Sequence, residues 1–187
     1  PFVVLGLWVS SAEVGIYGAA SRTAMLTSFL LLAVNSIASP KFSALYQNGD
    51  IEALGNISRG ASMLTTLIAG PVLAVFLIAP TWVMQFFGPQ FVEGALILSI
   101  LAVGEFVNAV TGPAAFLLVM CGYERLVRNN ILICTFINII LCLVCIPYYG
   151  VVGAAIAVAI TAAIQNILAA IIVWKKIGVS TIPLRIK

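Results

Sequence analysis

Long apolar runs, separated by short polar stretches, make up almost the whole chain. A transmembrane helix needs about 20 apolar residues, because each residue adds ~1.5 Å and the bilayer core is roughly 30 Å thick. We therefore predict an all-α integral membrane protein, a polytopic helical bundle in which a truncated helix precedes five complete transmembrane helices. The predicted spans are 1–9 (partial), 17–46, 60–78, 92–120, 130–146 and 151–174, all within one transmembrane domain, residues 1–187.

Proline and glycine predict where these helices bend, end or approach one another. A proline inside a helix removes a backbone donor, so we expect Pro40 to kink its span, and Gly70-Pro71 and Gly112-Pro113 to interrupt theirs. The small residues of Gly153-Ala154-Ala155 predict close packing between helices. Between the spans we expect a polar turn, a short segment along the membrane interface and a tight turn, at residues 10–15, 51–59 and 148–150 respectively.

Composition limits the kind of surface and the kind of chemistry. The chain is 63% hydrophobic and 8% charged, whereas soluble domains are about 25% charged. Most of its outer surface must therefore face lipid. Histidine is absent, which removes imidazole catalysis and the commonest metal ligand. Cys142 and Cys145 have the spacing of a redox motif, but in an apolar helix they are expected to pack as small apolar residues. We expect no enzyme activity, cofactor, metal or nucleic-acid partner.

The cations predict the orientation of the helices. Lys and Arg are enriched in cytoplasmic loops, and eight of the nine fall at alternate span ends, on one side of the membrane. We therefore expect a multi-pass protein of the cell inner (cytoplasmic) membrane with a cytoplasmic C-terminus. The chain begins with Pro1 inside an apolar run, and we expect it to be a piece of a longer protein, cut upstream. The eight cations are Lys41, Arg59, Arg125, Arg128, Lys175, Lys176, Arg185 and Lys187.

Glu105 is the one acidic residue deep inside an apolar run. A carboxyl group near the middle of a bilayer costs on the order of 2.5 kcal/mol unless it faces protein, water or a partner. Two interpretations stay open: a protonated carboxyl bonded to a neighbouring helix, and a residue on a hydrated transport pathway. In both, the helix turns this face inward.

Several short stretches of turn and packing residues form a family pattern. They are Gly15-Ile16-Tyr17, Ser39-Pro40-Lys41-Phe42, Leu45 to Asp50, Phe87-Gly88-Pro89-Gln90-Phe91, Gly122-Tyr123-Glu124-Arg125 and Ile146 to Ala155. With them the chain resembles the C-terminal half of polysaccharide-biosynthesis flippases, the Wzx-type O-antigen and exopolysaccharide translocases. These belong to a superfamily, MOP or MATE-like, that also holds multidrug exporters and lipid II flippases. The resemblance covers nearly the whole chain but about half of a family member.

The resemblance implies two six-helix lobes around a central cavity that opens alternately to each side of the membrane. This chain is then equivalent to the C-terminal lobe of a MATE-like fold, without its N-terminal lobe. The implied substrate is an oligosaccharide repeat unit linked to undecaprenyl pyrophosphate, moved across the cytoplasmic membrane for cell-surface polysaccharide, including lipopolysaccharide. Implied partners are this lipid-linked oligosaccharide, membrane lipids, and the polysaccharide polymerase with its chain-length machinery.

Polar residues within the spans are the candidates for a substrate or ion pathway. Arg22 either meets a pyrophosphate or sugar in the cavity or extends to the outer headgroups. Glu105 either serves a coupling ion or proton, or pairs with a cation of the missing lobe, and Asn108 shares its helix face. The remaining amides either bond sugar hydroxyls or form interhelical hydrogen bonds; these candidates are Asn35, Asn138 and Asn166.

A second group of candidates, Lys41, Arg125 and Arg128, lies at the predicted cytoplasmic surface. These cations either fix the topology or meet the anionic substrate at the inward mouth. The alternative functions are a cation-coupled multidrug or small-molecule exporter of the same superfamily and, more remotely, an integral membrane transferase. The exporter predicts several acidic residues in the spans, and the transferase predicts clustered carboxylates, His or a metal motif.

Overall fold

The computed structural model describes residues 2–183, and these residues are helical apart from short connections. Four helical stretches are long and apolar enough to cross a membrane: Ser11–Gln47, Ile51–Ile78, Pro89–Thr111 and Glu124–Ile177. The prediction of an all-α polytopic membrane protein is confirmed. The elements in chain order are α1 (Phe2–Trp8), α2 (Ser11–Gln47), α3 (Ile51–Ile78), α4 (Pro80–Gln85), the 3₁₀ helix η1 (Pro89–Gly94), α5 (Ala95–Thr111), α6 (Ala114–Met120) and α7 (Glu124–Ile177).

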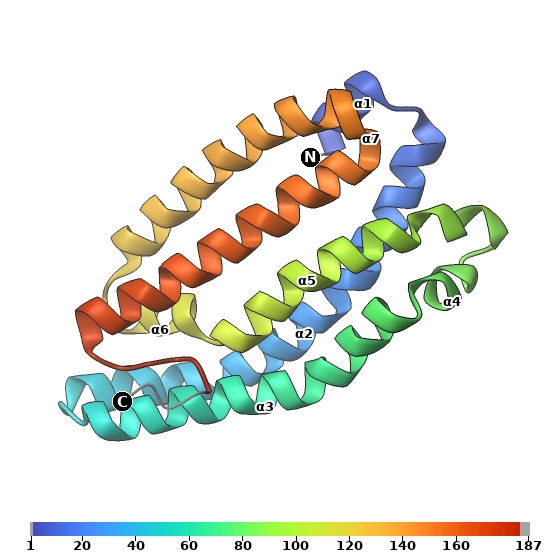
Figure 1. Ribbon diagram of the computed structural model, residues 1–187. Coiled ribbons are helices and arrows are strands. Elements are labelled where there is room, and N and C mark those ends of the chain that lie inside the picture. The colour runs from blue at the N-terminus through green and yellow to red at the C-terminus, as the bar shows by residue number, and fades with distance from the viewer. Residues whose placement is uncertain (1, 184–187) are drawn as a thin grey trace.

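The last helix is a hairpin of two long arms. Gly150 has φ 54° and ψ −133°, which is not helical, and the chain turns back there (Figure 1). Glycine adopts this conformation without the penalty that a Cβ brings. The reversal lies in the predicted tight turn, and residues 124–149 and 151–177 form the two arms. Lys175 and Lys176 lie in the last turn of the second arm, where cations interact favourably with the helix dipole.

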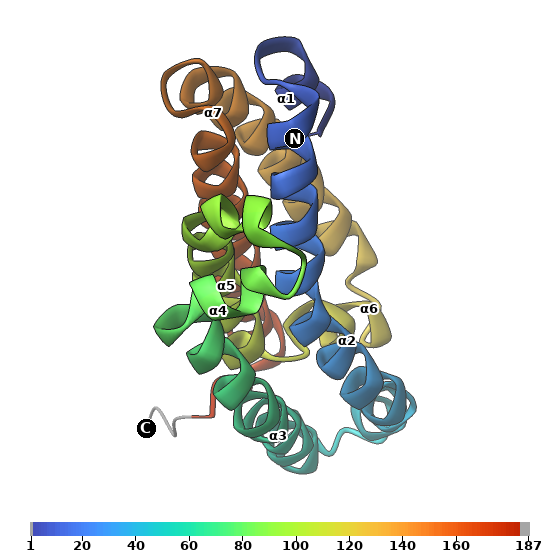
Figure 2. The same ribbon diagram turned by 90° about the vertical axis from the view of Figure 1, so that its right-hand side faces the viewer.

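The Glu105 helix occupies the middle of the bundle. α5 packs against α7, α2 and α3, and the two views in Figures 1 and 2 place it among these helices. Gly104 makes part of this possible, since a Cβ there would lie 3.1 Å from Cα of Ala159 on α7. Small residues at such contacts let membrane helices approach closely. Glu105 therefore lies next to the helix–helix interfaces, as predicted for a helix that turns this face inward.

The beginning of α2 corrects one prediction. We expected a polar turn at residues 10–15, but α2 already starts at Ser11 because Ser10 and Glu13 form a capping box. The Ser10 hydroxyl accepts a hydrogen bond from the Glu13 backbone N–H, and the Glu13 carboxylate accepts one from the Ser10 backbone N–H at 3.1 Å. Both bonds satisfy donors that a bare helix end leaves open.

One of the two predicted interruptions is absent. α3 contains Pro71, yet it is one continuous helix, and α2 likewise continues through Pro40. The segment 51–59 is the first part of α3 rather than a separate interfacial piece, and the Asp50 side chain caps it by accepting the Ala53 N–H at 2.9 Å. Membrane helices tolerate a proline where neighbouring helices compensate for the lost bond. The other predicted interruption is real, since Gly112 separates α5 from α6 with φ 63° and ψ −142°.

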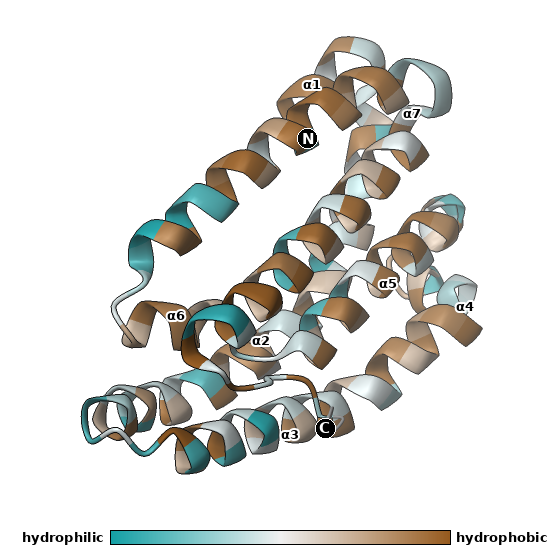
Figure 3. Cartoon of the chain, turned by 60° about the vertical axis from the view of Figure 1, so that its left-hand side comes forward, coloured by the Kyte–Doolittle hydropathy of each residue, from teal (hydrophilic) through white to brown (hydrophobic). Residues whose placement is uncertain are grey.

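The outer surface is apolar, as the composition predicted. Hydrophobic residues run along the helices in Figure 3. Large apolar side chains such as Leu67 and Ile78 on α3, and Phe136 on α7, are 66–84% exposed. In water such a surface would promote aggregation, whereas lipid solvates it.

Candidate functional site

Glu105 forms a small hydrogen-bonded cluster across the α2–α5 interface. The Ser28 hydroxyl on α2 donates to Oε2 of Glu105 at 2.6 Å. Asn108, one turn further along α5, lies with its Nδ2 3.3 Å from the same oxygen and 3.4 Å from Ser28 Oγ. The first bond is short and strong, whereas the two amide contacts are longer than an ordinary N–H···O bond and are easily exchanged. Helix spacing places Glu105 and Asn108 on one face, as predicted.

This cluster lies in the wall of a cavity of about 470 Å³, which we call the Glu105 cavity. α2 and α5 provide its polar wall, α6 contributes Ala115 and Phe116, and the second arm of α7 contributes Asn166. None of the described residues that line it is Lys or Arg. The lining residues are Met25, Ser28, Phe29, Leu31, Leu32, Asn35, Glu105, Asn108, Gly112, Ala115, Phe116 and Asn166.

Asn35 is the most constrained polar residue in this wall. It lies seven positions after Ser28, so both face the same side of α2. It is 0% exposed, and neither its amide nitrogen nor its amide oxygen has a hydrogen-bond partner among the described residues. A buried amide without partners is unfavourable by about 1–3 kcal/mol. Buried polar groups in folded proteins are normally completed by protein, ordered water or a ligand.

The structure separates the predicted asparagines into two groups. Asn35, Asn108 and Asn166 line the Glu105 cavity, and the Asn166 Nδ2 donates back to the Ala162 carbonyl of its own helix at 2.9 Å. Asn138 does not line it. Its Nδ2 donates to Thr161 Oγ1 at 3.3 Å, which ties the two arms of α7 together. This contact is the interhelical hydrogen bond that sequence reasoning kept as the alternative for each amide.

Arg22 lies away from the Glu105 cavity. It precedes Ser28 by six positions on α2, which is about 9 Å along the helix axis. Its exposed side chain lines a different hollow of about 560 Å³, together with Phe2, Phe87 and Phe91. The structure thus brings four of the six pathway candidates together and leaves Arg22 and Asn138 outside.

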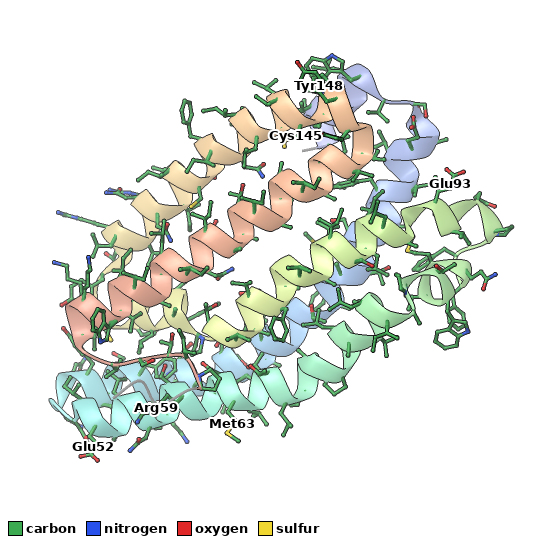
Figure 4. The ribbon with its side chains drawn as sticks, in the orientation of Figure 1. Glu52, Arg59, Met63, Glu93, Cys145 and Tyr148 are labelled. Carbon is green, nitrogen blue, oxygen red and sulfur yellow. The ribbon has the colours of Figure 1, made fainter. Side chains whose placement is uncertain are left out.

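The remaining cations gather at one end of the bundle. Lys41 lies in the last part of α2, Arg125 and Arg128 in the first turns of α7, and all three are exposed. Figure 4 shows Arg59 at this same end, opposite Tyr148 at the α7 reversal. Lys41, Arg125 and Arg128 do not line the Glu105 cavity. Arg185 and Lys187 lie outside the described residues.

Ser28 is the site residue that sequence reasoning missed. A single serine in a span is common, because its hydroxyl can bond a carbonyl of its own helix. The available signal was the seven-residue spacing to Asn35, which places both on one helix face.

No group of three or more His, Cys, Asp or Glu that could hold a metal ion occurs among residues 2–183. The site therefore offers hydrogen-bonding groups and one carboxyl inside an apolar bundle.

Two curated proteins of the archaeon Haloferax volcanii are similar to this chain. The probable flippase AglR is 28% identical over 181 residues, which cover 89% of this chain and 36% of that protein. The probable low-salt glycan biosynthesis flippase Agl15 is 24% identical over 166 residues, covering 88% of this chain and 35% of that protein. The chain thus spans about a third of the length of these relatives. No family model matches it, and no solved structure matches it.

Proposed function

We propose that this protein is part of a flippase that moves lipid-linked glycan units across a membrane, with the Glu105 cavity on the path of the glycan. The observation that carries the proposal is the hydrogen-bonded cluster of Glu105, Ser28 and Asn108 beside the unpartnered amide of Asn35. Polar groups at membrane depth are unfavourable, and where they persist they face a partner or a water-filled pathway. The similarity to two named flippases supports the same interpretation.

The substrate we propose is an oligosaccharide repeat unit on undecaprenyl pyrophosphate. A sugar chain and a pyrophosphate cannot cross hydrocarbon unaided, because their polar groups would lose their hydrogen bonds to water. A carrier must therefore offer a polar path while the prenyl tail stays in lipid. We propose alternating access, in which this chain forms the C-terminal lobe and rocks against a second lobe around a site near the midplane. The relatives are named as flippases rather than enzymes, which agrees with a transport role.

The proposed location is the inner membrane, with the cationic end of the bundle in the cytoplasm. The clustering of Lys41, Arg59, Arg125 and Arg128 at one end supports this orientation. These cations would also meet an anionic substrate as it enters. Polysaccharide polymerase and chain-length proteins are the partners we propose on the outer side, because the delivered units must be joined there.

A cation-coupled exporter is the second candidate. The observation in its favour is that the Glu105 cavity holds a carboxyl and, among the described lining residues, no Lys or Arg, which suits a cationic substrate. The phrase "glycan biosynthesis" in the name of one relative weighs against it. An integral membrane transferase lacks support, since the described lining residues of the Glu105 cavity include no second carboxyl group.

The test is complementation of a strain that lacks its own polysaccharide flippase, using the gene that encodes this chain. We expect the wild-type gene to restore surface polysaccharide. We expect Glu105→Gln to lower this by about tenfold or more at equal membrane levels, because the amide replaces one of the two acceptor oxygens with a donor, and a buried polar group without a partner costs ~1–3 kcal/mol. The matched control is Glu93→Gln, an exposed carboxyl in η1, which should complement fully. Failure of the wild type, with reduced accumulation of a fluorescent cation instead, would establish the exporter.

A further inference from the structure

We propose that the Glu105 cavity binds one uncharged sugar ring, and that Glu105 makes the cavity reject rings that carry a carboxylate. The proposal rests on the proposed function, because the ring would belong to the transported glycan. It goes further by assigning the site to the sugar rather than to the pyrophosphate, and by naming the residue that sets the preference. Four properties of the cavity support it: its size, its hydrogen-bonding groups, its aromatic walls and its charge.

The size of the cavity favours an organic ligand over an ion. Its volume is about 470 Å³, whereas one water molecule occupies ~30 Å³ in the liquid, and a bare cation needs no more than that. Small-molecule sites in proteins have volumes of about 300–1,000 Å³. A single sugar ring with several hydroxyl groups is a ligand of that class.

The polar groups suit a ligand that both donates and accepts hydrogen bonds. A sugar hydroxyl has one donor and two acceptor positions, like the hydroxyl of serine. Asn35 offers an amide with two free donors and a free acceptor, and the amide of Asn108 makes only contacts of 3.3 and 3.4 Å. Glu105 accepts the Ser28 hydroxyl at Oε2, and no hydrogen bond among the described residues reaches its Oε1. These groups come from facing helices, so neighbouring hydroxyls of one ring can be bound from two sides.

The apolar walls suit the remaining surface of a sugar ring. Phe29 on α2 and Phe116 on α6 line the same cavity, and they are 65% and 39% exposed. The face of an aromatic ring carries partial negative charge, and the C–H groups on one face of a sugar ring carry partial positive charge. A ring held by amides at its edge can therefore pack its C–H face against phenylalanine.

The charge of the cavity decides which sugars it accepts. Its described lining includes the Glu105 carboxyl and neither Lys nor Arg. An anionic group placed there would lose hydration and lie beside the acceptor oxygens of Glu105, with no Lys or Arg among the described lining residues to compensate. A pyrophosphate and a uronic acid are both disfavoured for this reason. The phosphate end of the substrate must therefore be bound by other residues, and the ring in this cavity must be uncharged.

The test uses the purified protein, as its gene encodes it, in lipid nanodiscs. The probes are methyl glycosides of glucose, galactose and mannose and the corresponding uronic acids, and saturation-transfer NMR measures their binding. We expect at least one neutral glycoside to bind and its uronic acid to bind about tenfold more weakly or worse. Glu105→Gln, which keeps the shape of the side chain, should remove most of this difference. Glu93→Gln should preserve it.

Three outcomes would overturn the proposal: no neutral glycoside binds, the uronic acids bind as well as the neutral sugars, or Glu105→Gln leaves the difference unchanged. Phe116→Leu adds a second readout, since loss of the aromatic face should weaken every neutral glycoside while the preference against uronic acids remains. The binding test and the complementation test contradict different proposals when they fail. Sugar binding without restored polysaccharide would contradict the transport function alone, and restored polysaccharide without sugar binding would contradict this assignment alone.

Discussion

Individual polar side chains in this bundle differ in whether other residues of the fold provide their hydrogen-bond partners. Asn138 donates to Thr161 at 3.3 Å, and Asn130 donates to the Gln165 carbonyl at 2.9 Å. Both bonds join the arms of α7 and need nothing further. Asn35 is more deeply buried than either, but its amide has no partner among the described residues. A residue that lowers stability without a structural benefit is typical of a functional site.

Asn35→Leu tests this distinction at the residue scale. Leucine has a similar size and no polar atoms, so the variant should be more stable than the wild type, by about 1 kcal/mol or more. Transport should nevertheless fall, because the ligand loses an amide partner. Thermal unfolding in detergent and the complementation assay measure the two effects.

The matched control for this test is Asn138→Leu, which removes an amide that is bonded within the bundle. It should lower stability, since Thr161 then loses the hydrogen bond from the other arm of α7, although its own bond to the Ala157 carbonyl remains. A loss of stability in Asn35→Leu as well would mean that the Asn35 amide is bonded in the folded protein, and the argument for a ligand there would fail.

The α7 hairpin depends on glycine at the point where its arms meet. Gly153 follows the reversal by three positions, and a Cβ there would overlap the carbonyl oxygen of Cys145 on the first arm. The neighbouring Ala154 and Ala155 are 0% exposed, so this face has no room for a larger group. Because α7 also packs against α5, its geometry affects the wall that carries Asn166.

Gly153→Ala is therefore expected to destabilise the protein by about 1–3 kcal/mol, the range for forcing extra volume into a packed interior. Gly60→Ala is the control, because Gly60 lies within α3 and a Cβ there would meet no described heavy atom within 4 Å. Alanine there should be neutral or stabilising, by up to ~1 kcal/mol, since it favours the helix. Thermal unfolding of both variants measures the difference, and equal midpoints would contradict the close contact.

The molecule as a whole has two chemically different ends. Arg59 of α3 lies at one end, where α2 ends and α7 begins, and Tyr148 at the α7 reversal lies at the other (Figures 1 and 4). Between them the exposed surface is largely apolar. This distribution orients the bundle in a bilayer, because cytoplasmic segments are enriched in Lys and Arg.

Cysteine labelling tests that orientation. Tyr148→Cys places an exposed thiol at the reversal, and Glu124→Cys places one at the start of α7. A membrane-impermeant maleimide added to intact cells should label the first variant and not the second, whereas permeabilised cells should show both. The unsubstituted protein provides the baseline, since Cys121, Cys134 and Cys142 are buried and any labelling of the half-buried Cys145 is measured there. The reverse pattern would invert the proposed topology.

Much of the architecture follows from the sequence because its causes are local. Run length and composition predicted membrane-spanning helices, and Gly150 and Gly112 mark real breaks because the chain adopts positive φ there. Gly70-Pro71 was expected to interrupt its helix, yet α3 continues through it. Whether a proline breaks a helix depends on its neighbours in space, which a single chain segment does not reveal.

Some features of the candidate site also follow from the sequence, and others only from the tertiary structure. Helical periodicity alone determined that Glu105 and Asn108 share a face, and the apolar run alone determined that this face turns inward. Only the tertiary structure decided that Ser28, 77 positions away, bonds Glu105, that Asn166 joins the cavity, and that Asn138 and Arg22 do not. Helical spacing determines which residues share one face, but the rotation of each helix against its neighbours arises from side-chain packing between segments far apart in the chain.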